Sequence, residues 1–183
     1  MAPGISSFAL TKKQLYALAN ERNINTEFGI SHPYDGIEGV LRNLRVRDLN
    51  QGLDASNQID LEERRSAFGK NQWSGTKLDR QATVLRNGKI QQIPIVEVVV
   101  GDVCQIKAGD KLWADGLVIE SRDLKIDESG LIGEADFVNI RIGVMILADT
   151  DVKHGTGKMV VTGVGIYTLT GAIDWIMGHV SRD

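Results

Sequence analysis

The sequence has few cysteine, proline and aromatic residues. It contains one cysteine, Cys104, three prolines and 5% aromatic residues in 183 positions. A single cysteine cannot form an intramolecular disulfide, and Cys104 lies among alternating apolar residues that favour a small buried side chain over a reactive thiol. We therefore expect an intracellular, reducing compartment, with the cytoplasm, the mitochondrion and the axoneme as open alternatives.

The sequence also lacks a strong charge of one sign and a long hydrophobic run. It has 21 Lys and Arg against 24 Asp and Glu, a net charge of −3. This balance argues against nucleic acid as a partner. The densest apolar stretch, residues 93–103, is broken by Pro94, Glu97 and Gly101, whereas a membrane helix needs about 20 apolar residues. We expect a soluble chain without a membrane span of its own.

Short apolar segments and glycine turns dominate the second half of the sequence. Asn87-Gly88 separates two alternating segments and predicts a hairpin, because a tight type I′ turn needs positive φ at both positions. Gly-Asp and Asp-Gly turns punctuate residues 98–120. The pattern predicts an α+β, mainly β fold, in which a distorted, jelly-roll-like β domain carries a helical segment before it and a helix after it.

Several polar residues in this half are candidates for a metal or phosphate site. Asp102, Asp110 and Asp115 each lie beside a glycine, and we expect each to cap its own turn. Residues 154–158 resemble a phosphate loop only faintly, because they precede a strand instead of a helix. The three histidines are scattered without a second ligand at metal spacing. The sequence therefore predicts no metal and no cofactor.

Helical periodicity marks the first third of the chain. Thr11 is a candidate cap for a helix that ends near Asn23, and residues 36–44 form a second apolar face. A third helix, residues 60–68, ends at Gly69, and we interpret its charged residues 62–65 as a solvated surface. These features predict two parts, an amino-terminal helical segment (residues 1–73) and the β domain with its terminal helix (residues 74–183).

Residues 127–138 have the most specific pattern in the chain, Asp-Glu-Ser-Gly-Leu-Ile-Gly-Glu-Ala-Asp-Phe-Val. This stretch resembles the actuator-domain signature of P-type cation pumps, Asp-Glu-Ser-Ser-Leu-Thr-Gly-Glu-Ser-Asp-Pro-Val. Residues 98–116 and 157–165 resemble further actuator strands of the same family. The helix at 60–68 and its continuation Phe68-Gly69-Lys70-Asn71 resemble the cytosolic amino-terminal segment of plasma-membrane-type calcium pumps.

The resemblance implies a role for the signature and also a defect in it. In the family, the glutamate of Thr-Gly-Glu-Ser positions the water that hydrolyses an acyl phosphate. Gly133 and Glu134 remain, but Ile132 and Ala135 replace the two hydroxyl residues, and such a loop loses the polar geometry that places a water. The phosphorylation motif Asp-Lys-Thr-Gly-Thr does not occur in the sequence. We therefore expect a vestigial loop and no ATPase activity.

The resemblance also implies that membrane segments are missing. In the pumps, two membrane helices separate the amino-terminal segment from the actuator domain, whereas here a short Gly/Ser/Thr connector follows Asn71. Residues 168–177 resemble the helix that leads into the third membrane segment, and the chain stops soon after it. We interpret the chain as the water-facing part of a pump without its bilayer spans.

These observations favour a non-catalytic accessory or structural subunit of a larger protein assembly, with a membrane complex as one option for the partner. Trp73, Trp113 and Trp175 are candidate contact anchors, with burial in the core as the alternative for each. A regulatory fragment that binds a calcium pump or calmodulin is the second hypothesis. A residual acyl-phosphate hydrolase acting through Glu134 and an engineered pump fragment are the remaining ones.

Overall fold

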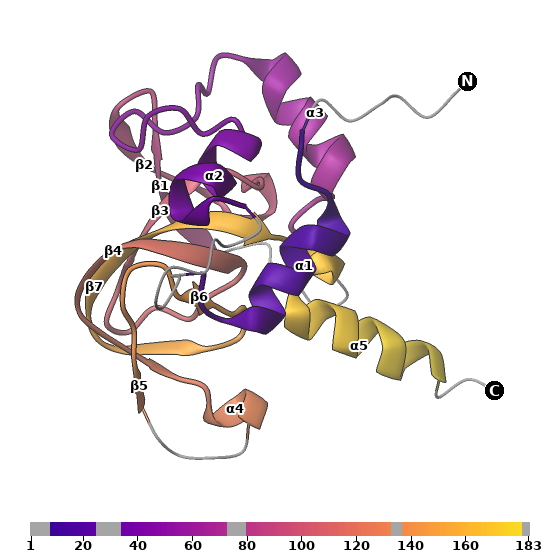
Figure 1. The fold of residues 1–183 in the computed structure, drawn as a ribbon, viewed down its shortest axis with the longest axis vertical. Helices are drawn as coiled ribbons and strands as arrows, with labels where there is room; N and C mark the ends of the chain where they lie inside the picture. The colour runs from indigo at the N-terminus through magenta and orange to yellow at the C-terminus, as the bar shows by residue number, and fades with distance from the viewer. Residues whose placement is uncertain (1–7, 25–33, 73–79, 133–136, 181–183) are drawn as a thin grey trace.

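The computed structural model describes residues 8–24, 34–72, 80–132 and 137–180 (Figure 1). Helix α1 (Lys12–Glu21) begins at Thr11, whose side chain accepts a hydrogen bond from the Gln14 amide while the Gln14 side chain accepts one from the Thr11 amide. This reciprocal capping box confirms the predicted helix start. The apolar face of α1 buries Leu15, Leu18 and Ala19.

Two more helices follow, α2 (Gly36–Asn43) and α3 (Gln58–Phe68). The Asn57 side chain caps α3 by accepting from the Asp60 amide at 3.1 Å. Gly69 ends α3 at a φ of 96°, and a Cβ there would lie 2.6 Å from the ring of Tyr167. The predicted glycine stop is confirmed, since both the backbone angle and the close ring require this residue.

The second half is an antiparallel sheet in the order β2-β1-β3-β7-β4-β5, with β6 paired to β4. Its strands are β1 (Gln81–Arg86), β2 (Lys89–Pro94), β3 (Val103–Lys107), β4 (Asp115–Asp127), β5 (Phe137–Asn139), β6 (Met145–Ile146) and β7 (Asp151–Gly163). Asn87 and Gly88 have φ of 52° and 67°, as the predicted hairpin requires. The β4–β7 pairing contains several register shifts, which bend this long pair around the core. The predicted β body is confirmed.

Short elements complete the chain: the 3₁₀ turns η1 (Ile95–Glu97) and η2 (Gly165–Tyr167), the turn of helix α4 (Ser129–Ile132) and helix α5 (Leu169–Val180). Helix α5 occupies the predicted position and projects away from the sheet (Figure 1). Among the described residues, no helix is both long and apolar enough to cross a bilayer.

The amino-terminal helices and the β body share one hydrophobic core. Phe8, before α1, packs on Phe68 of α3 with ring centroids 4.8 Å apart. The same buried cluster continues through Leu18 and Val40 to strand residues such as Val84. The predicted boundary between residues 73 and 74 lies outside the described residues, and the cluster shows that the helices before it are packed on the sheet instead of standing apart.

Candidate functional site

The signature stretch connects β4 to β5. Asp127, the last residue of β4, pairs with Phe137, the first residue of β5, so the two ends of the connection lie side by side. Helix α4 follows directly, from Ser129. Gly133, Glu134 and Ala135 lie outside the described residues, as does the side chain of Ile132. The prediction of a vestigial loop therefore stays a prediction, and the structure defines the residues on either side of it.

The start of this connection is held by charge. The Ser129 amide donates to Asp127 Oδ1 at 2.9 Å, and Lys153 Nζ lies 3.3 Å from Asp127 Oδ2. The hydrogen bonds from Ser129, followed by the contact with Lys153, hold the pKa of Asp127 below its ordinary value. Glu128 is buried and forms an ion pair with Arg22, which follows α1. The first residues of the signature are thus fixed from two sides.

The described residues provide no cluster of three or more His, Cys, Asp or Glu side chains suited to a metal. His154 is exposed, and its Nδ1 lies 3.2 Å from the Asp123 carbonyl oxygen. Residues 154–158 lie inside β7, which begins at Asp151, instead of preceding a strand as the sequence analysis expected. This stretch is a strand paired on both sides, not the strand-to-helix turn that cradles phosphate.

The three candidate anchor tryptophans lie in different environments. Trp113 is buried within the core cluster, whereas Trp175 on α5 is 51% exposed. Trp73 lies outside the described residues. Of the two described tryptophans, Trp175 is the one that presents a large apolar surface outward.

A buried arginine, Arg64, joins α3 to the β body. Arg64 is only 1% exposed, and its Nη1 donates to the carbonyl oxygens of Leu44 at 2.9 Å and Val100 at 3.0 Å. Its Nε donates to Asp60 Oδ2 at 2.7 Å. Burial lowers the pKa of Arg64, and Asp60 opposes that shift.

The expectation that residues 62–65 form a solvated surface is wrong for Arg64. The helical spacing of Leu61, Arg64 and Phe68 places all three on the buried face of α3, and this spacing is the signal that sequence reasoning missed. Its neighbour Arg65 does lie outside, where it pairs with Glu62 at 3.2 Å and Glu97 at 2.8 Å. Arg64 is thus buried and bonded to the β body, whereas the adjacent Arg65 lies on the surface.

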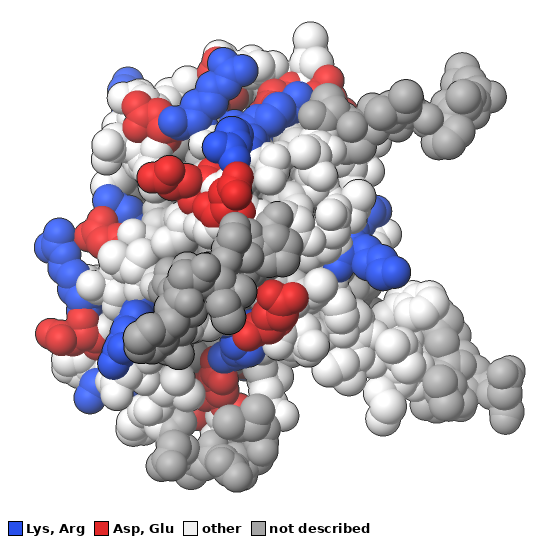
Figure 2. Space-filling model, viewed as in Figure 1, with Lys and Arg blue, Asp and Glu red and all other residues white. Residues whose placement is uncertain are grey.

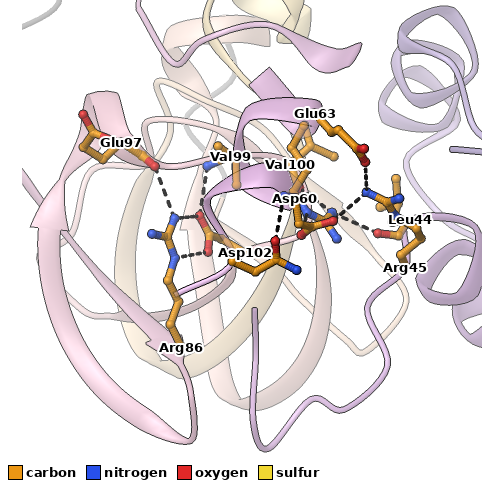
Figure 3. A network of polar contacts seen from close by, with 11 residues as sticks. Leu44, Arg45, Asp60, Glu63, Arg86, Glu97, Val99, Val100 and Asp102 are labelled. Carbon is orange, nitrogen blue, oxygen red and sulfur yellow. Dashed lines mark hydrogen bonds and ion pairs between the residues drawn. The ribbon is translucent and has the colours of Figure 1, made fainter. Parts of the chain in front are cut away.

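A second buried pair holds the first hairpin. Arg86, at the end of β1, donates from Nε and Nη2 to the two oxygens of Asp102, each at 2.7 Å, as Figure 3 shows. Asp102 Oδ2 also accepts from the Val99 amide at 2.9 Å, which is the turn cap predicted from the sequence. This bidentate geometry satisfies both buried charges.

Asp115 does not cap its own turn, contrary to the expectation. Its oxygens accept from the Ala148 amide at 2.8 Å and the Leu169 amide at 2.7 Å, so it joins β4 to the start of α5. Burial raises the pKa of Asp115 to about 6, and these two hydrogen bonds oppose the rise. Asp110 does accept from the Lys107 amide at 2.9 Å, as a local cap should.

The asparagine of the Phe-Gly-x-Asn motif bonds the amino-terminal segment to the β body. Asn71 is fully buried, donates to the Ile95 carbonyl oxygen at 2.9 Å and accepts from the Gly165 amide at 3.0 Å. Gly52 lies earlier in the helical segment at a φ of 67°, and a Cβ there would lie 1.8 Å from the Leu85 carbonyl oxygen. Asn71 and Gly52 of the amino-terminal segment therefore both lie against the β body.

The antiparallel body, its paired β4–β5 signature connection and its terminal helix define an actuator-type domain. The family model of the P-type ATPase actuator domain matches residues 76–175. The chain belongs to this family.

Individual relatives agree. The chain is 50% identical over 102 residues to plasma membrane calcium-transporting ATPase 4 of Bos taurus and 46% identical over 102 residues to that of Homo sapiens. Each match covers 55% of this chain and 8% of the relative. Among solved structures, a zinc-transporting PIB-type ATPase superposes with a TM-score of 0.52 at 21% identity, over 93% of this chain and 26% of the other. That likeness supports the fold alone. The family model and the calcium-pump relatives show that the chain is derived from a calcium-pump actuator domain.

Proposed function

We propose that this chain serves as a non-catalytic accessory subunit of a larger protein assembly, bound through α5. The observation that carries the proposal is the exposed apolar surface of this helix. Ile173, Trp175, Ile176 and Met177 are 52%, 51%, 52% and 66% exposed. Asp174 is the one charged residue between Leu169 and Val180.

Such a surface favours a covering partner. Helices that are apolar around most of their circumference are usually buried, and contiguous exposed apolar patches mark interaction sites. In Figure 2, the visible face of the described part of α5 carries no Lys, Arg, Asp or Glu, in contrast to the mixed charges over the body. Trp175 has the large, amphipathic side chain that is enriched at the centre of interfaces.

The non-catalytic part of the proposal rests on the signature. Replacement of two hydroxyl residues by Ile132 and Ala135 removes donors and acceptors beside Glu134. A single water needs several polar partners to be held for attack. We expect no turnover of acetyl phosphate above background, and equal rates for the wild type and Glu134→Gln. A rate that depends on Glu134 contradicts this part.

The accessory role is tested in the native source. The tagged chain is expressed there, extracts are resolved by native gel electrophoresis and size-exclusion chromatography, and the variants Trp175→Ala and Ile176→Asp are compared with Ile59→Asp. Ile59 is 76% exposed on α3, so it controls for the change of an exposed isoleucine elsewhere. We expect the wild type and Ile59→Asp to migrate in a large complex, and both α5 variants to migrate as free protein.

Two results oppose the proposal. Migration of the wild type as a monomer in native extract removes the basis for an accessory role. Retention of the complex in both α5 variants places the interface elsewhere. Co-purification of a calcium pump as the sole partner favours the regulatory alternative over a structural subunit.

A further inference from the structure

The chain that follows α1 is attached to the β body beside β6. Arg22 has a positive φ of 70° and turns the backbone at the end of the helix. Residues 22–24 then run antiparallel to residues 143–145: the Ile24 amide donates to the Gly143 carbonyl oxygen at 3.0 Å, and the Met145 amide to that of Arg22 at 2.7 Å. These main-chain bonds fix the backbone of Arg22 independently of its side chain.

The Arg22 side chain reaches the signature stretch. Its Nη2 pairs with Glu128 Oε1, across 106 positions in the sequence. The Glu128 side chain is only 5% exposed and that of Arg22 is 30% exposed, so the pair is shielded from water on the carboxylate side. The Glu128 carbonyl oxygen in turn accepts from the Leu131 amide at 2.8 Å, the bond that closes the turn of α4.

Through this ion pair, the turn of α4 depends on the position of α1. A buried carboxylate that loses its cation is strongly destabilised, because its desolvation is no longer compensated. If Arg22 withdraws, the buried Glu128 carboxylate is left without its cation, and a change of the backbone at residues 128–131 would bring it to water. We propose that Arg22 is a positioning residue that couples the amino-terminal helix to the signature turn, so that displacement of α1 opens α4. The coupling is reciprocal, as any linkage between two sites must be. It does not depend on the accessory role proposed above.

The test measures local opening by amide hydrogen exchange in the full chain, using NMR. Arg22→Met keeps the length of the side chain and removes the charge, Arg22→Lys keeps the charge, and Glu128→Gln keeps the shape of the partner. Arg42→Met is the matched control, because Arg42 pairs with Asp35 at 2.8 Å where both side chains are at least 67% exposed. The Leu131 amide reports the turn, and the Ile24 amide reports the docking of the backbone.

We expect exchange at Leu131 to rise about tenfold in Arg22→Met, within the range of measured pair couplings, and to rise less in Glu128→Gln, because the neutral amide leaves no buried charge uncompensated. Exchange at Ile24 should stay near its wild-type value, and the melting temperature should fall by only about 3–5 °C. Arg22→Lys should lie within about threefold of the wild type, and Arg42→Met should be unchanged. The double variant of Arg22→Met and Glu128→Gln should exchange more slowly at Leu131 than Arg22→Met alone, since no buried carboxylate is then left without a cation.

Three results overturn the inference. Unchanged exchange at Leu131 in a folded Arg22→Met protein shows that the turn does not depend on this cation. A parallel rise at Leu131 and Ile24 shows general loosening instead of a specific coupling. If Arg22→Met does not fold, Arg22→Gln takes its place, and wild-type exchange at Leu131 in that folded variant rejects the proposal.

Discussion

Replacement of Arg64 by methionine should destabilise the whole chain, although Arg64 belongs to a strongly charged helix segment. The side chain makes two hydrogen bonds to buried carbonyl oxygens and one ion pair with Asp60. Methionine fills a similar volume without any donor. The carbonyl groups of Leu44 and Val100 then lose this donor, at about 1–3 kcal/mol each.

The ion pair adds less to this cost, because Asp60 keeps Arg45 as a second partner at 2.5 Å. We therefore expect Arg64→Met to lower the free energy of unfolding by about 3–5 kcal/mol, as the removal of one partner from a buried polar network usually does. For a chain of this size, such a loss lowers the melting temperature by about 10 °C.

The assay is urea unfolding followed by circular dichroism, with Arg65→Met as the control. Arg65 occupies the next position in α3, but its partners Glu62 and Glu97 are 69% and 54% exposed, so its loss should cost less than about 1 kcal/mol. Equal shifts of the urea midpoint in both variants would refute the argument, since burial of the accepting groups would then not matter.

Three further predictions concern single residues of the β body and its contacts. Because the pKa of Asp115 is raised to about 6, its protonated form is favoured by folding, and the stabilisation present below about pH 3.8 is lost as the pH rises through about 6. We compare the free energy of unfolding of the wild type with that of Asp115→Asn in urea titrations. The wild-type value minus the variant value should fall by about 3 kcal/mol between about pH 3.5 and pH 7, and the same value at both pH values contradicts the prediction. Gly52→Ala should be destabilised by at least about 1 kcal/mol more than Gly109→Ala in thermal melts, because both have positive φ but only Gly52 meets a carbonyl oxygen; equal losses rule the clash out. Burial raises the pKa of the Cys104 thiol, so it should react with a disulfide reagent only after unfolding, and rapid labelling of the native protein would show otherwise.

Local sequence signals predicted the parts of the fold that depend on neighbouring residues. The capping box at Thr11, the Asn87-Gly88 turn and the stop at Gly69 each follow from the backbone preferences of one or two residues. The burial of Cys104 was predictable for the same reason, since alternation along one strand decides which face a side chain occupies. The signature resemblance supplied the fold class that these local signals alone leave open.

The contacts between distant segments were not predictable in this way. The bond from Asp115 to the Leu169 amide and the pair between Arg22 and Glu128 join residues 54 and 106 positions apart. No local pattern specifies such a partner, and the apparent turn residue Asp115 had a plausible cap close by. Arg64 is an intermediate case. Its position on the apolar face of the helix was predictable from the spacing, but a charged side chain is usually exposed, so its burial was not predicted.

The contacts of the amino-terminal segment imply that residues 76–175, the part matched by the actuator family model, are not an independent folding unit in this chain. Val99 forms a buried cluster with Leu53 and Leu61, so both of its partners in that cluster come from the helical segment. Asn71 likewise satisfies buried main-chain groups at η1 and η2. A protein that starts at residue 76 exposes this apolar surface to water, at about 25 cal/mol for each Å² uncovered. We expect it to melt at a lower temperature than the full chain and to bind a hydrophobic dye, and addition of a separate fragment of residues 8–72 should reverse both effects. Equal melting of the two proteins would instead show that the helices only decorate a self-sufficient sheet.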